Sequence, residues 1–161
     1  MASVTLDDLD LRILGALQAD ASLSNLELSR RVHASAPTCL RRVRALREAG
    51  VIARQIVIVD PLTLGPSLTA VVEVSLDRQA AEDYDAFESY ICAEAAVTQC
   101  YRVSPGPDFV VIAEVRDMAE YDALARRLFK SSANIRNVRT FFSTRCAKFE
   151  ANAPVRPNVS R

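Results

Sequence analysis

Arginine is concentrated in one short part of this sequence, where few acids balance it. Seven arginines and one acid lie between residues 30 and 54, so that this stretch carries a net charge of +6 (7 − 1) in a chain whose formal net charge is zero. Phosphate is the anion that such a surface attracts, and the stretch therefore predicts binding to nucleic acid. A solvated helix face that happens to carry these arginines is the other interpretation.

The remaining residues that carry chemistry form no catalytic or metal-binding pattern. The sequence has one histidine, His33, no glycine-rich phosphate loop and no C-x-x-C pair, so we predict neither an enzyme nor a metal or cofactor site. The acid pairs Asp7-Asp8 and Glu82-Asp83 fall at helix starts, where the helix dipole accounts for them. The cysteines are predicted to be small buried side chains: Cys39, Cys92, Cys100 and Cys146.

Two short helices joined by a tight turn are predicted between residues 24 and 50. Ser24 stands three residues before Glu27, the spacing at which each side chain caps a backbone N–H of the other. Ser35 is a second N-cap signal, with Pro37 in the following turn. A helix, a four-residue turn and a basic second helix together favour DNA binding over a merely solvated face.

The second helix is predicted to have a buried face and a basic face. Leu40, Val43 and Leu46 recur every three residues and are expected to point towards the core. At about 100° per residue, three residues form the opposite face and three more flank it. These are Thr38, Arg41 and Ala45, flanked by Pro37, Arg42 and Arg44.

The neighbouring segments complete a small module. A stripe of apolar residues predicts a preceding helix that Thr5 would cap. Residues 51–59 are rich in β-branched side chains and predict a small strand pair, or wing. The stripe of the first helix is Leu9, Ile13, Ala16 and Leu17.

This module resembles the winged helix-turn-helix of the Lrp/AsnC family of bacterial and archaeal transcriptional regulators. The resemblance extends from about Leu6 to about Lys148 and implies sequence-specific binding to double-stranded DNA. The residues that carry it are Ser24-Asn25, Glu27-Leu28-Ser29, Ser35, Pro37 and Cys39-Leu40-Arg41-Arg42-Val43-Arg44.

Helix geometry suggests a role for each residue of the expected DNA-binding site. Arg41 would read a base edge, whereas Arg42 and Arg44 would neutralise phosphates. The start of the second helix would lie at the DNA backbone through Ser35, Pro37 and Thr38.

A different pattern follows a boundary that is rich in proline and glycine. We place a linker at residues 60–67, between domains 1–59 and 68–150. After it the pattern is strand, helix, strand, strand, helix, strand, with the last strand at 138–146. This order predicts a ferredoxin-like α+β domain for effector binding and dimerisation, with two helices on one face of a four-stranded antiparallel sheet.

The other face of this sheet is predicted to be apolar and uncovered. Val71, Val110 and Ile112 would lie there, and pairing of two sheets would hide them. A two-fold dimer would also place two recognition helices in successive major grooves. The resemblance implies the same dimer, and often tetramers or octamers.

The loop at residues 104–108 is a second expected site. In the Lrp/AsnC family the corresponding loop helps to bind a small effector, usually an amino acid, between dimers. The resemblance therefore implies effector contacts from Ser104, Gly106 and Asp108, with Asp108 accepting a hydrogen bond from an ammonium group. Two prolines replace the family's glycine and aromatic residue, so that a rigid hairpin loop without a ligand is the alternative.

The remaining expectations concern location, the C-terminus and a rival function. No apolar run reaches the length of about 18 residues that marks a membrane span, and no signal pattern opens the chain, so we predict a cytoplasmic protein without a membrane partner. Residues 151–161 are predicted to form a tail that is disordered or contacts a partner. The rival function is an effector-sensing or oligomerising module that contacts proteins instead of DNA.

Overall fold

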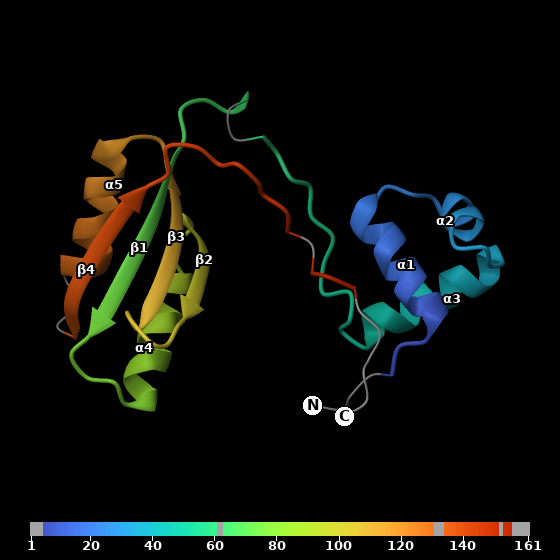
Figure 1. The fold of residues 1–161 in the computed structure, drawn as a ribbon, viewed down its shortest axis with the longest axis horizontal. Helices are drawn as coiled ribbons and strands as arrows, with labels where there is room; N and C mark the ends of the chain where they lie inside the picture. The colour runs from blue at the N-terminus through green and yellow to red at the C-terminus, as the bar shows by residue number, and fades with distance from the viewer. Residues whose placement is uncertain (1–4, 61–62, 131–133, 152, 156–161) are drawn as a thin grey trace. The chain divides into compact units, whose positions relative to one another are not determined.

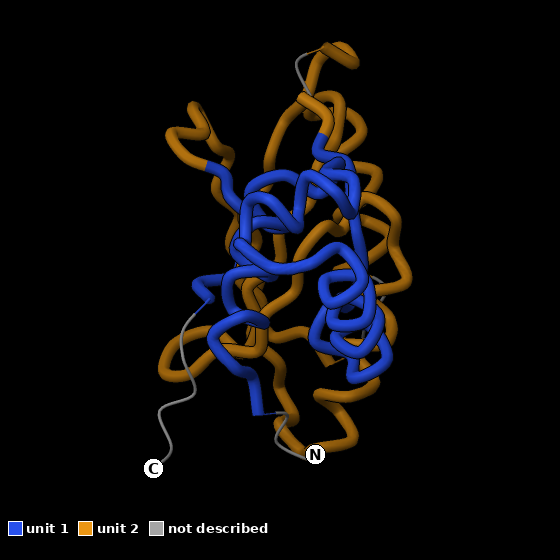
Figure 2. The backbone as a smooth tube through the Cα atoms, turned by 90° about the vertical axis from the view of Figure 1, so that its right-hand side faces the viewer, with its two compact units in different colours: residues 1–58, 149–161 blue, residues 59–148 orange. Residues whose placement is uncertain are grey.

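The structure, a computed structural model, describes residues 5–60, 63–130, 134–151 and 153–155. The chain divides into two compact units (Figure 2). One contains residues 1–58 and 149–161, and the other contains residues 59–148. The first unit is helical, whereas the second is built on a sheet (Figure 1).

The first unit has three helices around one apolar core. The helix α1 begins with a capping box in which Asp7 and Asp10 bind each other's backbone N–H groups. The predicted cap at Thr5 is therefore wrong, because Asp7 stands directly before the helix and reaches the free N–H groups of its first turn. The helices are α1 (Asp8–Ala19), α2 (Asn25–Arg31) and α3 (Ala36–Glu48), and the buried apolar residues are Ile13, Ala16, Leu28, Val32, Cys39 and Leu46.

Residues 51–60 contain no strand, so the strand pair expected there is not formed within this chain. The N–H groups of Val51 and Ile52 bind the carbonyl of Leu46 at 2.9 and 3.1 Å, and Gly50 has a φ of 71°, so these bonds cap and end α3. Residues 51–60 contain no glycine that could reverse the chain in a tight hairpin turn. The side chains at positions 56 to 59 are consequently exposed.

The second unit has the predicted ferredoxin-like order, and its four strands are antiparallel in the spatial order β2-β3-β1-β4. The last strand ends at Phe142, not at residue 146, because its partner strand has only two residues beyond that pairing. The elements are β1 (Leu68–Leu76), α4 (Ala81–Cys92), β2 (Val97–Arg102), β3 (Phe109–Val115), α5 (Met118–Ala125), the short π-helix η2 (Arg126–Lys130) and β4 (Ile135–Phe142).

The core of this unit lies between the sheet and its helices. Alternate residues of β1 and β3 are buried beneath side chains of α4, α5 and η2, so the helices cover one face of the sheet, as Figure 1 shows. The other face carries Val71, Val110 and Ile112, which are only half-buried in the isolated chain, and Phe141, which is exposed. The register places Val71 opposite both Ile112 and Phe141, as a continuous apolar row.

The cysteines do not share one environment. Cys39 is buried and Cys100 is half-buried, whereas Cys92 and Cys146 are exposed. The prediction of buried side chains is thus wrong for the last two, because Cys92 ends α4 and Cys146 follows the final strand. None of the described helices is both long enough and apolar enough to span a membrane.

Candidate nucleic-acid interface

The turn between α2 and α3 is fixed by backbone and side-chain hydrogen bonds. Ser24 and Glu27 form the predicted capping box at the start of α2. At its end the N–H of Ala34 binds the carbonyl of Ser29 at 3.0 Å, and His33 has a φ of 54°, in the left-handed region. The chain thereby changes direction within the four residues between α2 and α3.

The start of α3 is capped and tied to α2. The Oγ of Ser35 accepts from the N–H of Thr38 at 3.3 Å, and the two hydroxyls lie 2.7 Å apart. The Asn25 side chain donates to the carbonyl of Ala36 at 2.8 Å, which joins the first turns of both helices. Sequence reasoning missed this role of Asn25, since a side chain that binds a carbonyl eleven residues away leaves no local signal.

The buried face of α3 differs from the prediction at one position. Cys39 and Leu46 are buried and Val43 is half-buried, but Leu40 is 61% exposed. A spacing of three residues drifts by about 60° at each step on a helix of 100° per residue, so Leu40 and Leu46 lie about 120° apart. The buried stripe instead follows the spacing i, i+4, i+7 from Cys39.

The outer face of α3 carries the residues expected to meet DNA. Arg41 is exposed and forms no salt bridge within the described part of the chain. Arg44 is exposed and its Nε lies 3.1 Å from the carboxylate of Glu48, one turn later. Such an exposed pair contributes little and can open readily. Ser35 and Pro37 are exposed beside them, and Thr38 is half-buried.

Arg42 does not share this outer face. Its Nη2 lies 2.7 Å from an oxygen of Asp7 and its Nη1 lies 3.3 Å from an oxygen of Asp10, both at the start of α1. The Arg42 side chain is 31% exposed, and Asp10 is 5% exposed. The N–H of Asp10 and the guanidinium of Arg42 lower the pKa of Asp7. The structure thus separates Arg42 from Arg41 and Arg44.

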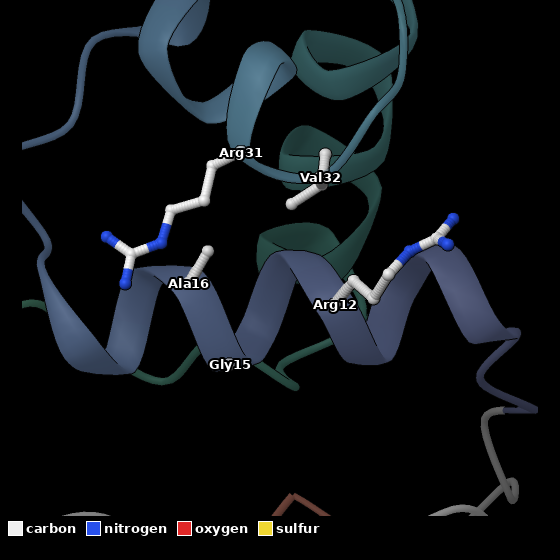
Figure 3. A pocket seen from close by; sticks show the side chains of 5 residues that line it. All are labelled: Arg12, Gly15, Ala16, Arg31 and Val32. Atoms are coloured by element: carbon white, nitrogen blue, oxygen red, sulfur yellow. The ribbon is translucent and has the colours of Figure 1, made fainter.

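A hollow of about 230 Å³ lies between α1 and α2 and is lined by two arginines. Figure 3 shows that the side chains of Arg12 and Arg31 extend towards opposite ends of α1. The Arg12 guanidinium is also paired with Asp8 at 3.3 Å. Because the two cations do not converge, this hollow is not a built anion site.

The expected effector loop of the second unit has a different organisation from the one inferred. Asp108 is 8% exposed and accepts three hydrogen bonds from its own chain. Its donors are the N–H of Leu76 at 2.7 Å, Gln79 Nε2 at 2.9 Å and the Tyr84 hydroxyl at 2.9 Å. Burial raises the pKa of Asp108, but these donors outweigh it and the pKa is lowered. The hydrogen bond to Asp108 raises the pKa of Tyr84.

These contacts change the interpretation of the loop. Ser104 and Gly106 are exposed, whereas the carboxylate of Asp108 is turned inward, so the three residues do not converge on one site in this chain. The inferred ammonium contact of Asp108 is therefore replaced by an internal one. The physical reason is the free N–H of Leu76 at the end of β1, which a buried carboxylate can satisfy.

A cavity of about 350 Å³ lies near the same end of the sheet. Its polar groups include the guanidinium of Arg78 and the carboxylate of Asp83, 3.4 Å apart, and its apolar wall includes Phe87. The backbone of Arg78 is held by the side-chain amide of Asn134 through two hydrogen bonds. The full lining is Leu76, Arg78, Asp83, Ala86, Phe87, Tyr90 and Asn134.

Two family models match the two halves of the chain. A winged helix-turn-helix DNA-binding model matches residues 6–53, and the Lrp/AsnC ligand-binding domain matches residues 69–152. The first match includes α1 to α3, and the second extends from the second residue of β1 through β4.

Similar proteins cover nearly the whole chain. The leucine-responsive regulatory protein of Rhizobium meliloti is 34% identical over 90% of this chain and 93% of its own length. The AsnC family transcriptional regulator from Agrobacterium tumefaciens has a similar structure, with a TM-score of 0.86 and 30% identity. The match covers 92% of this chain and 97% of that chain. The L-Met complex of a Neisseria meningitidis transcriptional regulator has a TM-score of 0.85 and 27% identity. The match covers 93% of this chain and 97% of that chain. The chain therefore belongs to the Lrp/AsnC family of transcriptional regulators.

Proposed function

We propose that this regulator binds a specific DNA sequence with the outer face of α3. The observation that carries the proposal is the exposed pair of arginines, Arg41 and Arg44, on a helix whose start is capped and positioned by α2. Arg41 would donate to a base edge and Arg44 would exchange Glu48 for a phosphate. The exposed start of the helix, with Ser35, Pro37 and Thr38, would lie at the DNA backbone.

Leu40 adds an apolar contact to this surface. It is exposed on the free protein although it is a large apolar side chain, and it lies about 100° from Arg41 around the helix. In a major groove a leucine at this position can pack against the methyl group of thymine. We therefore expect the operator to contain a thymine beside the base that Arg41 reads.

The experiment measures binding of a labelled duplex from the region immediately upstream of the coding sequence, at two salt concentrations. Arg41→Gln should reduce discrimination at one base pair by about 1–3 kcal/mol. Arg44→Gln should weaken all duplexes equally and reduce the log–log salt slope by about 0.9. Arg116→Gln is the matched control, because Arg116 forms the same exposed i,i+4 pair, at 3.1 Å, in the other unit.

Two outcomes would contradict the proposal. If neither Arg41→Gln nor Arg44→Gln differed from the parent, α3 would not be the recognition helix. If the parent bound no duplex at any salt concentration, the chain would act as a protein-contact module.

We infer further that an amino acid modulates this binding. The relatives named above include a leucine-responsive protein and one solved with L-Met. The cavity beside Arg78 and Asp83 offers a guanidinium for a carboxylate and a carboxylate for an ammonium group, above the apolar side chain of Phe87. Adding a pool of amino acids to the binding assay tests this: unchanged affinity in the parent would count against an amino-acid effector.

We also propose that two copies pair through the helix-free face of the sheet. The apolar row of Val71, Ile112 and Phe141 supports this, since water would otherwise cover it. Ile112→Lys should lower the molar mass measured by light scattering, whereas Ser89→Lys, on the exposed surface of α4, should not. An unchanged mass for Ile112→Lys would exclude this face as the dimer interface.

A further inference from the structure

The arginines of α3 fall into two groups that the charge count alone does not separate. Arg44 is 81% exposed and has a single exposed partner. Arg42 is less than half as exposed and has two partners, Asp7 and Asp10, on another helix. The local positive charge therefore includes one arginine whose charge is already matched by acids of this chain.

The acids that hold Arg42 are themselves fixed. Asp7 accepts from the N–H of Asp10 at 2.9 Å, and Asp10 accepts from the N–H of Asp7 at 3.2 Å. The guanidinium thus joins α3 to the rigid first turn of α1, and not to a mobile surface side chain. Because Asp10 is buried, withdrawal of Arg42 would leave its carboxylate without a counter-ion.

The position of Arg42 on its helix supports the same conclusion. At about 100° per residue it lies about 160° from Arg44 but only about 40° from the buried Leu46. Its Nε is buried and has no hydrogen-bond partner among the described residues, so the stem of the side chain is enclosed. A phosphate contact would require Arg42 to leave both acids and swing away from the core.

We propose that Arg42 is a positioning residue, and that the ion pairs of Arg42 with Asp7 and Asp10 set the orientation of α3 against α1. This assignment rests on the proposed DNA binding by α3. Arg42 acts through Arg41 and Arg44, which it holds at the angle needed to enter a groove. It does not itself neutralise a phosphate.

Replacing an acid that pairs with Arg42 changes DNA affinity in opposite directions, depending on whether Arg42 positions α3 or contacts a phosphate. Asp7→Asn keeps the helix cap, because asparagine caps as well as aspartate, but it removes the charge nearest to Arg42. If Arg42 positions α3, this variant weakens binding to the specific duplex by about three- to tenfold, the size expected for loss of a partly exposed pair. If Arg42 binds phosphate, freeing it strengthens binding and steepens the salt slope.

Asp8→Asn is the matched control for net charge. Asp8 lies in the same first turn but pairs with Arg12, not with Arg42. A general effect of charge on DNA affinity would appear equally in both variants, in the direction of tighter binding. The proposal requires that Asp7→Asn and Asp8→Asn move the affinity for the specific duplex in opposite directions, or that only Asp7→Asn moves it.

Variants of Arg42 itself provide a second readout. Arg42→Gln should reduce specific affinity while leaving the log–log salt slope unchanged, whereas loss of one phosphate contact would reduce that slope by about 0.9. Arg42→Lys keeps a cation and should recover part of the specific affinity. Helix content by circular dichroism identifies any variant that has lost its fold. If Arg42→Gln has lost it, the comparison of Asp7→Asn with Asp8→Asn decides the assignment.

Each result decides the assignment. Weaker binding by Asp7→Asn with an unchanged slope for Arg42→Gln supports it. Tighter binding by Asp7→Asn, or a slope reduced by about 0.9 in Arg42→Gln, overturns it and makes Arg42 a phosphate ligand. A parent that binds no DNA overturns the proposed function and this assignment together, and that failure is seen before any variant is compared.

Discussion

Among the described residues, each unit has one buried carboxylate, and the two are stabilised in different ways. Asp10 in the helical unit has an ionic partner, the guanidinium of Arg42, and one backbone N–H. Asp108 in the sheet unit has three neutral donors from three places in the chain. Both satisfy the rule that a buried charge needs partners, one through opposite charge and the other through hydrogen bonds.

The difference determines how each acid depends on its neighbours. Removing Arg42 leaves Asp10 as a buried carboxylate without this counter-ion, which destabilises the helical unit. Removing one donor from Asp108 still leaves two others. Conversely, Asp108 accepts from the side chain of Gln79, the hydroxyl of Tyr84 and the N–H of Leu76, so its own removal affects three groups at once. We therefore expect the stability of the sheet unit to depend most on Asp108 itself, and the stability of the helical unit to depend on Arg42, the partner of Asp10.

The largest expected effect is that of Asp108→Ala. This change leaves the buried N–H of Leu76 without its acceptor and frees Gln79 and Tyr84, so the free energy of unfolding should fall by about 2–4 kcal/mol. Urea denaturation followed by circular dichroism measures it. Asp108→Asn keeps the shape of the side chain and one acceptor oxygen and should lose less. Equal losses in the two variants would show that neither the shape nor a single acceptor oxygen is enough, and that the ionised carboxylate with both oxygens is required.

The next effect is that of Arg42→Gln in the helical unit. Because the ion pairs are partly exposed, we expect a loss of about 1–3 kcal/mol, between the values typical of exposed and buried pairs. Arg44→Gln, on the same helix, should change stability by no more than about 0.5 kcal/mol. Thermal unfolding of both variants measures the difference. Equal stability would show that the ion pairs of Arg42 with α1 stabilise the unit no more than the exposed pair of Arg44 does.

Much of the fold was predictable from local patterns. The caps at Ser24 and Ser35 define α2 and α3 from neighbouring residues alone, and alternation along residues 68–76 defines β1. The ferredoxin-like order follows from the sequence of such elements. Side-chain hydrogen bonds and strand ends were less predictable, because they depend on a partner that is distant in the sequence.

The candidate sites show the same limit. The helical wheel placed Arg41 on the outer face and both Arg42 and Arg44 beside it. Arg41 and Arg44 are exposed, but the partners of Arg42 lie more than thirty residues away at the start of α1. A helical wheel centred on Cys39 instead of Leu40 would have placed Arg42 beside the core. The inward turn of Asp108 had no such signal, because its donors come from the end of β1 and from α4 and the loop before it.

The smallest expected effect is a difference in acid sensitivity between the parent and Asp108→Asn. The folded pKa of Asp108 is below its ordinary value of 3.8, so the folded state binds fewer protons than the unfolded state in this range. The stability contributed by the Asp108 charge is therefore fully present above the unfolded pKa and is lost as the pH falls through the folded pKa. Asp108→Asn has no such charge to lose, whereas groups such as Asp7 and Glu27, whose pKa values are also lowered, titrate in both proteins. Urea midpoints measured from about pH 6 to about pH 2 should show the advantage of the parent shrinking towards acid. A constant advantage would mean that Asp108 is as well stabilised when protonated, and its hydrogen bonds would then owe little to its charge.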